Sequence, residues 1–77
     1  MRMERDPKVD PQPFDRFEMP GCEVIVYGLQ TFFFPTVREY VETVIRERRD
    51  GAVLETKWKP SLSDFRSQIA PAKVLPC

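Results

Sequence analysis

The chain has 77 residues, and its twelve basic and twelve acidic side chains cancel to a net charge of zero. A chain of this length forms one domain at most, and a domain so small buries only ~60 % of the surface that its unfolded form exposes. Such domains usually depend on disulfides, metals or partners. A neutral chain generates no long-range field that would hold nucleic acid or an anionic membrane, which argues against a dedicated binder of either.

The two cysteines and the charged N-terminal residues bear on the cellular compartment of the protein. Cys22 and Cys77 could remain free thiols, form one disulfide, or link to another chain. Residues 1–5 are charged and lack the apolar core of a secretory signal, and no apolar run approaches the ~20 residues that a membrane span needs. We expect a soluble protein without a membrane span, in an intracellular compartment, either cytoplasmic or organellar.

Residues 1–20 are predicted to form an extended N-terminal arm, because its prolines block regular strand pairing. Phe14 and Phe17 interrupt this polar stretch. Two interpretations stay open: the rings fold back onto the domain's own core, or they anchor the arm in a groove on a partner. The prolines are Pro7, Pro11, Pro13 and Pro20.

Residues 22–29 give the clearest strand signal, because β-branched and aromatic residues fit a pleated, mostly buried surface. Apolar residues fall on both faces of this strand, so both faces should be covered. The consecutive phenylalanines Phe32–Phe34 follow, and three neighbours cannot all face one core in any regular structure. At least one of these rings is expected to pack under the start of the following helix, and another is a candidate for exposure at the surface.

Residues 36–49 are predicted to form a helix. Thr36 and Glu39 have the spacing of a capping box, and Gly51 is placed to end the helix. Apolar residues recur three and four positions apart, which is typical of one buried helical stripe. These residues are Val37, Tyr40, Val41, Val44 and Ile45.

Alternating polar and apolar residues predict two more strands. In the segment 52–59, Leu54 and Trp58 share one face, and residues 65–70 alternate again. The sequence thus predicts an α+β fold of order βαββ. One helix would cover a three-stranded sheet of order 1-3-2, half of a ferredoxin-like fold. The arm would span 1–20, the domain 21–71 and an irregular tail 72–77, leaving one sheet edge open.

No motif for catalysis or cofactor binding is visible. The chain has no histidine, so Cys22 has no imidazole to activate it and a zinc site would need other ligands. We therefore expect no enzyme activity, no metal and no cofactor. A thiol-dependent role for Cys22 or Cys77 is a minor alternative, and it would require a depressed thiol pKa.

The middle of the chain, about residues 18–70, resembles the YbeD-like family of small uncharacterised bacterial proteins. The resemblance implies an ACT-like βαββαβ fold, of which this chain would lack the second helix and fourth strand. It implies no biochemical role and no catalytic residue. The motifs that carry it are Met19-Pro20, the run 24–28, Lys59-Pro60-Ser61 and Phe65-Arg66-Ser67.

The sequence favours a non-enzymatic interaction module, such as an accessory subunit, that binds a protein partner or a second copy of itself. The contacts would be the open sheet edge and the aromatic residues Phe14, Phe17, Phe32, Phe33 and Phe34. The alternative is a small RNA-binding protein, in which Trp58 could also stack on a base. Its basic residues would be Arg46, Arg48, Arg49, Lys57 and Lys59.

Overall fold

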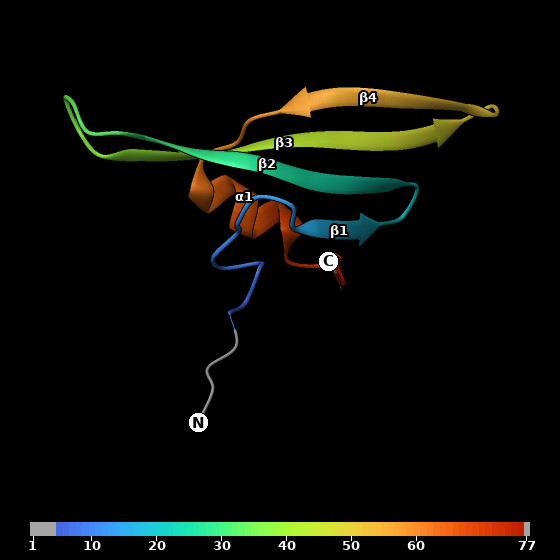
Figure 1. Ribbon diagram of the computed structural model, residues 1–77, viewed down its shortest axis with the longest axis horizontal. Helices are drawn as coiled ribbons and strands as arrows, with labels where there is room; N and C mark the ends of the chain where they lie inside the picture. Colours follow the sequence, from blue (N-terminus) through green and yellow to red (C-terminus); the bar gives the residue numbers. More distant parts are fainter. Residues whose placement is uncertain (1–4, 77) are drawn as a thin grey trace.

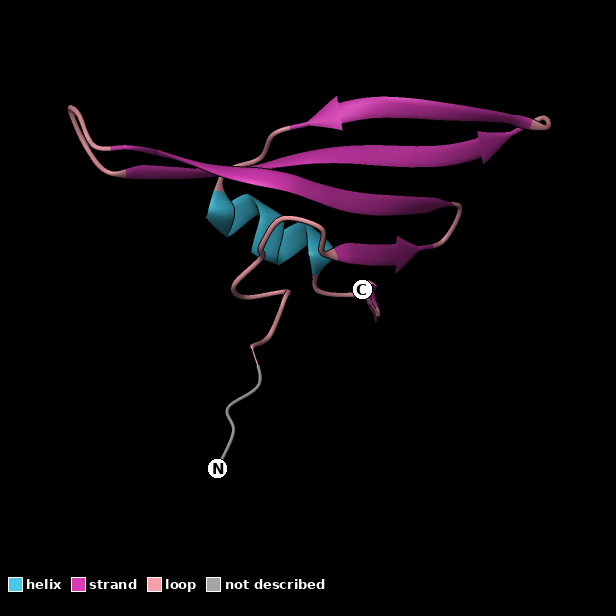
Figure 2. Cartoon of the chain, viewed as in Figure 1, coloured by secondary structure: helices cyan, strands magenta, loops and turns pink. Residues whose placement is uncertain are grey.

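The computed structural model describes residues 5–76, and this range forms five strands and one helix. The elements are β1 (Arg16–Met19), β2 (Cys22–Phe32), β3 (Arg38–Arg49), β4 (Ala52–Trp58), α1 (Leu62–Ile69) and β5 (Lys73–Leu75). All strands pair antiparallel in one sheet of order β4-β3-β2-β1-β5. Figure 1 shows α1 beneath the sheet, and Figure 2 shows how far strands predominate.

The predicted fold class is wrong. The sheet has five strands in the described range rather than three in the order 1-3-2, and no two neighbouring strands of it are parallel. The chain therefore does not form half of a ferredoxin-like fold. Of the predicted elements, the strands at 22–29 and 52–59 are confirmed, as β2 and β4. The segment 36–49 forms strand β3 where a helix was predicted, and the segment 65–70 lies largely in helix α1 where a strand was predicted.

Strand β3 occupies the segment in which a helix was predicted. Its apolar residues come as two adjacent doublets, Tyr40-Val41 and Val44-Ile45, which fit a helical stripe equally well. In a strand each doublet places one residue on each face of the sheet. Val41 belongs to the buried core, whereas Val44 is paired with Ile25 on the other face. The β-branched residues of this segment favour that outcome.

Tight turns join β1 to β2 and β3 to β4. Asp50 and Gly51 connect β3 to β4, and both have positive φ values, 52° and 80°. An Asp-Gly pair with this backbone makes a two-residue hairpin turn whose twist matches the strands. Pro20 and Gly21, the latter at φ 80°, connect β1 to β2. Gly51 therefore closes a hairpin instead of ending a helix.

A serine, Ser61, caps the N-terminus of helix α1. The Ser61 side chain accepts a hydrogen bond from the Asp64 amide at 3.3 Å, which satisfies one free N–H of the first turn. Phe65 and Ile69 lie four residues apart and are both fully buried. This spacing places both side chains on the same side of a helix, toward the sheet.

The core lies between α1 and the face of the sheet that α1 covers, called here the helix face. Phe17 meets Phe65 edge to face, with ring centroids 5.6 Å apart, and Trp58 lies half-buried against Phe65 at 6.1 Å. The other face of the sheet, called here the open face, has no covering element among residues 5–76. The buried apolar residues are Phe17, Val24, Val26, Val41, Phe65, Ile69 and Ala72.

The predicted arm and tail both belong to the fold. Residues 16–19 form β1, and residues 73–75 form β5, which pairs with β1. Pro11 is fully buried, so the proline-bearing segment before β1 packs on the domain rather than extending from it. Prolines therefore mark turns of a folded segment here. Residues 1–4 and 77 lie outside the described range.

Candidate functional site

The loop of the β2–β3 hairpin carries the most exposed apolar group of the described chain. Phe32, Phe33, Phe34 and Val37 are 50, 76, 90 and 66 % exposed, and we call these four residues the tip patch. Figure 1 shows this loop at one end of the molecule, beyond α1. The expected exposure of one phenylalanine is confirmed, but the expectation that another packs under a helix start is wrong, because a strand follows the loop and all three rings are exposed.

Strand length explains why the tip patch is uncovered. β2 and β3 remain paired as far as Phe32 and Arg38. The chain that returns from β4 reaches β3 at an isolated bridge between Tyr40 and Ser61, and α1 starts at the next residue. The end of the β2–β3 hairpin thus extends beyond α1, the only helix of residues 5–76. No part of this range packs over the tip, so its rings stay in solvent.

A hollow of about 410 Å³ lies beside the tip patch. Phe32 and Tyr40 form part of its wall and pack edge to face, with ring centroids 5.8 Å apart. Phe34, Pro35 and the cationic residues Arg38 and Lys59 also line it. An aromatic hollow with cations beside it is suited to an apolar side chain whose neighbouring carbonyl or carboxylate groups accept hydrogen bonds.

Strand β4 forms one edge of the sheet. It pairs with β3 in a regular register from Thr43↔Trp58 to Arg49↔Ala52, and no described strand lies on its outer side. Every residue from 52 to 57 is exposed. The opposite edge, β5, has only three residues. The open edge that was predicted is thus a seven-residue strand with free backbone groups on one side.

The two aromatic residues of the predicted arm have different positions. Phe17 is fully buried in the core and is not available on the surface. Phe14 is 77 % exposed, has a positive φ of 76°, and donates its backbone N–H to the Val26 carbonyl. Of the two interpretations, folding back onto the core describes Phe17, and only Phe14 remains accessible to a partner.

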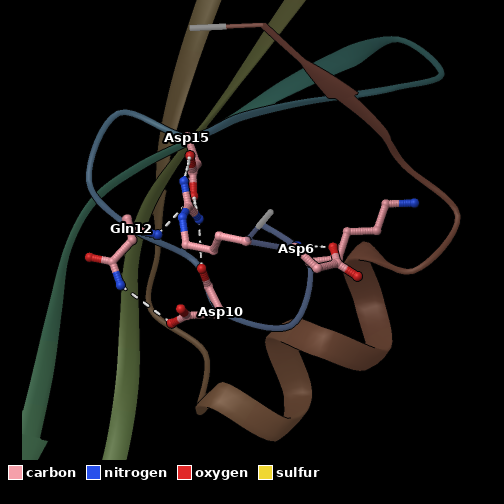
Figure 3. A network of polar contacts seen from close by, with 6 residues as sticks. Asp6, Asp10, Gln12 and Asp15 are labelled. Carbon is pink, nitrogen blue, oxygen red and sulfur yellow. Dashed lines mark hydrogen bonds and ion pairs between the residues drawn. The ribbon is translucent and has the colours of Figure 1, made fainter. Parts of the chain in front are cut away.

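A buried aspartate fixes the segment that carries Phe14. The Asp15 carboxylate receives two hydrogen bonds from the Arg5 guanidinium, at 2.6 and 2.9 Å, and one from the backbone N–H of Gln12 at 2.8 Å. Figure 3 shows Gln12 beside Asp15 in this network of polar contacts. Burial alone would raise the pKa of Asp15, but the hydrogen bonds and the Arg5 charge outweigh burial and hold this pKa below its ordinary value.

Three basic residues of the nucleic-acid hypothesis, Arg46, Arg48 and Lys57, share the open face, and the carboxylate of Glu55 lies among them. Arg46 and Arg49 pair with carboxylates, Glu55 at 3.5 Å and Glu47 at 3.4 Å. Arg48 lies opposite Val53 near the β3–β4 turn, whereas Lys59 follows the far end of β4. The remaining member, Lys57, is paired with Val44. Trp58 packs against Phe65 on the helix face, which occupies the ring that could otherwise have stacked on a base.

The cysteine thiols and possible metal ligands are the other chemical groups that the sequence brought into question. Cys22 is a half-buried free thiol, and Cys77 lies outside this range. Among residues 5–76 no cluster of three or more His, Cys, Asp or Glu side chains could hold a metal ion. None of the helices in this part of the chain is both long and apolar enough to cross a membrane.

Comparison with known proteins yields no relative. A scan against protein-family models, a search of curated proteins and a search of solved structures each found no match to this chain. The surface features that bear on function are the tip patch with its hollow and the β4 edge. Sequence reasoning assigned no site to Arg38 and Tyr40 and gave Lys59 only to the nucleic-acid alternative, because only pairing across the hairpin and with Ser61 brings the three together.

Proposed function

We propose that this chain is a non-enzymatic protein-interaction module, which binds partners through the tip patch and the open edge of β4. The observation that carries the proposal is the exposure of Phe33 and Phe34, at 76 and 90 %, in a hairpin loop without a covering element in residues 5–76. Large contiguous apolar groups on a protein surface mark interaction sites, and aromatic side chains dominate binding energy there.

The position of the tip patch supports this function over a structural role. Its rings make no part of the core, which is built from other residues of β1, β2, β3 and α1. An isolated apolar residue on a surface needs no explanation, whereas four within one loop do. The neighbouring hollow adds Arg38 and Lys59, which give the patch a polar rim of the kind seen around interface centres.

No observation favours the nucleic-acid hypothesis in the same way. Phosphate binding needs several unpaired cations on one surface. Here Arg46 and Arg49 already contact carboxylates, and Arg48 and Lys59 lie toward opposite ends of β4.

A comparative pull-down tests the tip. The wild-type chain and the variant Phe33→Ser/Phe34→Ser are immobilised, and proteins retained under native conditions are identified by mass spectrometry. We expect a defined protein that the wild type retains and the double variant loses. Because both rings lie outside the core, the circular dichroism spectrum and the urea midpoint of the variant should match the wild type.

The matched control is Phe14→Ser, which removes an exposed phenylalanine from a different segment. This variant should retain the same protein as the wild type. A retained set that is identical for the wild type and the tip variant would contradict the role of the tip. A protein lost only with Phe14→Ser would instead move the contact to the N-terminal segment.

A further inference from the structure

We infer that the occupant of the β4 edge is a second copy of the same strand, paired antiparallel about a twofold axis at Thr56. This inference rests on the proposed function, because it names the partner of one of its two surfaces. The product would be a continuous sheet of ten strands, in which both helices lie on the same side. Three features of β4 support this inference: an edge without proline or bulge, charges placed symmetrically about Thr56, and the position of Trp58.

The edge of β4 lacks most of the devices that usually prevent strand pairing. Natural edge strands are protected by prolines, bulges, charged side chains such as lysine, or short length. The segment Ala52–Trp58 has no proline, and its register with β3 is regular, whereas the bulge of this sheet lies in β2 between Val26 and Gly28. Its two charges, Glu55 and Lys57, have opposite signs. They therefore oppose pairing only in registers that place like charges across from each other.

The charges of β4 are arranged symmetrically about Thr56. In an antiparallel pair centred on this residue, Glu55 of each copy lies directly opposite Lys57 of the other, so two charge pairs form on the open face. Opposite charges directly across a strand pair stabilise the pairing, and like charges destabilise it. Charge complementarity thus favours a second copy as the occupant.

The neighbouring symmetric registers are less favourable. Directly opposed residues in a sheet share a face, so a twofold axis perpendicular to the sheet must pass through a residue position. An axis at Glu55 would place this carboxylate opposite its own copy, and an axis at Lys57 would do the same with two ammonium groups. An axis at Leu54 would form no charge pair. The axis at Thr56 alone among these combines two opposite-charge pairs with no like-charge pair.

The same register would also cover apolar surface on the helix face. Leu54 of each copy would lie opposite Trp58 of the other. Leu54 is 47 % exposed, and Trp58 is half-buried against Phe65 of α1. Aromatic–aliphatic pairs of this kind stabilise neighbouring strands. The dimer would thus place an apolar contact on one face and charge pairs on the other.

Charge reversal tests the register. Sedimentation equilibrium over a range of concentrations should show a wild-type dimer. Glu55→Lys and Lys57→Glu each place two like-charge pairs in the interface, so each single variant should be monomeric at concentrations where the wild type dimerises. The double variant Glu55→Lys/Lys57→Glu restores both opposite-charge pairs, and it should dimerise again. Recovery by the double variant also shows that the single changes do not act by unfolding the chain.

A mixture of the two single variants gives the sharpest outcome. One copy then carries lysine at both positions and the other carries glutamate at both, so every pair across the interface is opposite in charge. We expect a heterodimer from two variants that are monomeric alone. A wild type that remains monomeric up to about 1 mM would overturn the inference. So would single variants that dimerise as well as the wild type.

A cysteine at the axis checks the position independently. In a chain with Cys22→Ser and Cys77→Ser, the variant Thr56→Cys should oxidise to a disulfide-linked dimer, because directly opposed Cα atoms lie about 4.5–5.5 Å apart, within the range of disulfides. Ala52→Cys, on the same exposed strand but far from the axis, is the matched control and should cross-link much more slowly. Equal rates for the two variants would overturn the assignment of the axis.

The two proposals fail separately. Phe33→Ser/Phe34→Ser leaves β4 unchanged, so it should preserve the dimer while abolishing retention of a partner at the tip. A monomeric wild type that still retains a tip-dependent protein would overturn the dimer alone. A dimer whose retained proteins do not depend on the tip would overturn the tip contact and support the edge.

Discussion

The phenylalanines of the core and those of the hairpin loop have the same chemistry and opposite environments. Phe17 and Phe65 are fully buried and contact each other edge to face, whereas Phe33 and Phe34 are 76 and 90 % exposed. Burial removes apolar surface from water and stabilises the fold, which accounts for the two phenylalanines of the core. The tip pair gains nothing of this kind. The core rings thus serve folding, and the exposure of the tip rings is the basis of the proposal that they serve binding.

The largest test of this comparison is the removal of a core ring. Phe65→Ala should lower the free energy of unfolding by about 3–5 kcal/mol, because it creates a cavity beneath the sheet and removes contacts to Phe17 and Trp58. Urea denaturation followed by circular dichroism measures the change. In a domain this small such a loss is a large part of the total stability. A change within about 0.5 kcal/mol, as at surface sites, would contradict the assigned core.

Sequence patterns predicted some parts of this division. The strand signal of β2 and the alternation in β4 indicated the correct element type, and three adjacent phenylalanines implied that not all could be buried. These inferences are local, since they depend on residue type and on the two-residue period of a strand. The exposed part of the candidate site was therefore accessible to sequence reasoning, although its binding role remains a proposal.

Other parts could not be predicted in the same way. The apolar doublets of β3 satisfy both a helical and a strand period, and only pairing with β2 decides between them. Phe65, Ser67 and Ile69 alternate within α1, which concealed a helix of eight residues. The serine three residues before Asp64 and the Asp50-Gly51 pair were the local signals that could have corrected both errors. The burial of Phe17 depends on tertiary contacts.

The second prediction concerns the anchor of the N-terminal segment. Asp15→Asn should lower the free energy of unfolding at neutral pH by about 1–3 kcal/mol, because the Arg5 guanidinium and the Gln12 amide lose a charged acceptor. The pKa of Asp15 is lower in the folded chain than its ordinary value of 3.8. The contribution of this carboxylate is therefore present above that value and disappears as the pH falls through the lower, folded pKa.

Urea denaturation as a function of pH measures this effect. The difference in stability between the wild type and Asp15→Asn should be constant near neutral pH and shrink below the ordinary pKa of 3.8. Asp64→Asn is the matched control, since Asp64 is exposed in the first turn of α1. A difference for Asp15→Asn that persists unchanged into strong acid would show that the charge of Asp15 is not what holds the segment.

The third prediction tests how α1 is held over the core. Ser61→Ala removes the side-chain oxygen that accepts the Asp64 amide, and should cost about 1 kcal/mol of stability. Ser67→Ala, at an exposed position in the same helix, serves as the control and should change stability by less than about 0.5 kcal/mol. The two urea midpoints are compared directly. Equal midpoints would mean that the cap contributes nothing to the covering helix.

The smallest expected effect is the most informative about function. Phe34→Ala should change the free energy of unfolding by less than about 0.5 kcal/mol, because its ring is 90 % exposed and belongs to no core cluster. Urea denaturation would measure it beside Phe65→Ala, so that the same substitution is compared in two environments. If Phe34→Ala destabilised the chain as strongly as the core variant, the tip would be packing against the domain in solution. A null effect is the outcome that the proposed binding role of the tip requires.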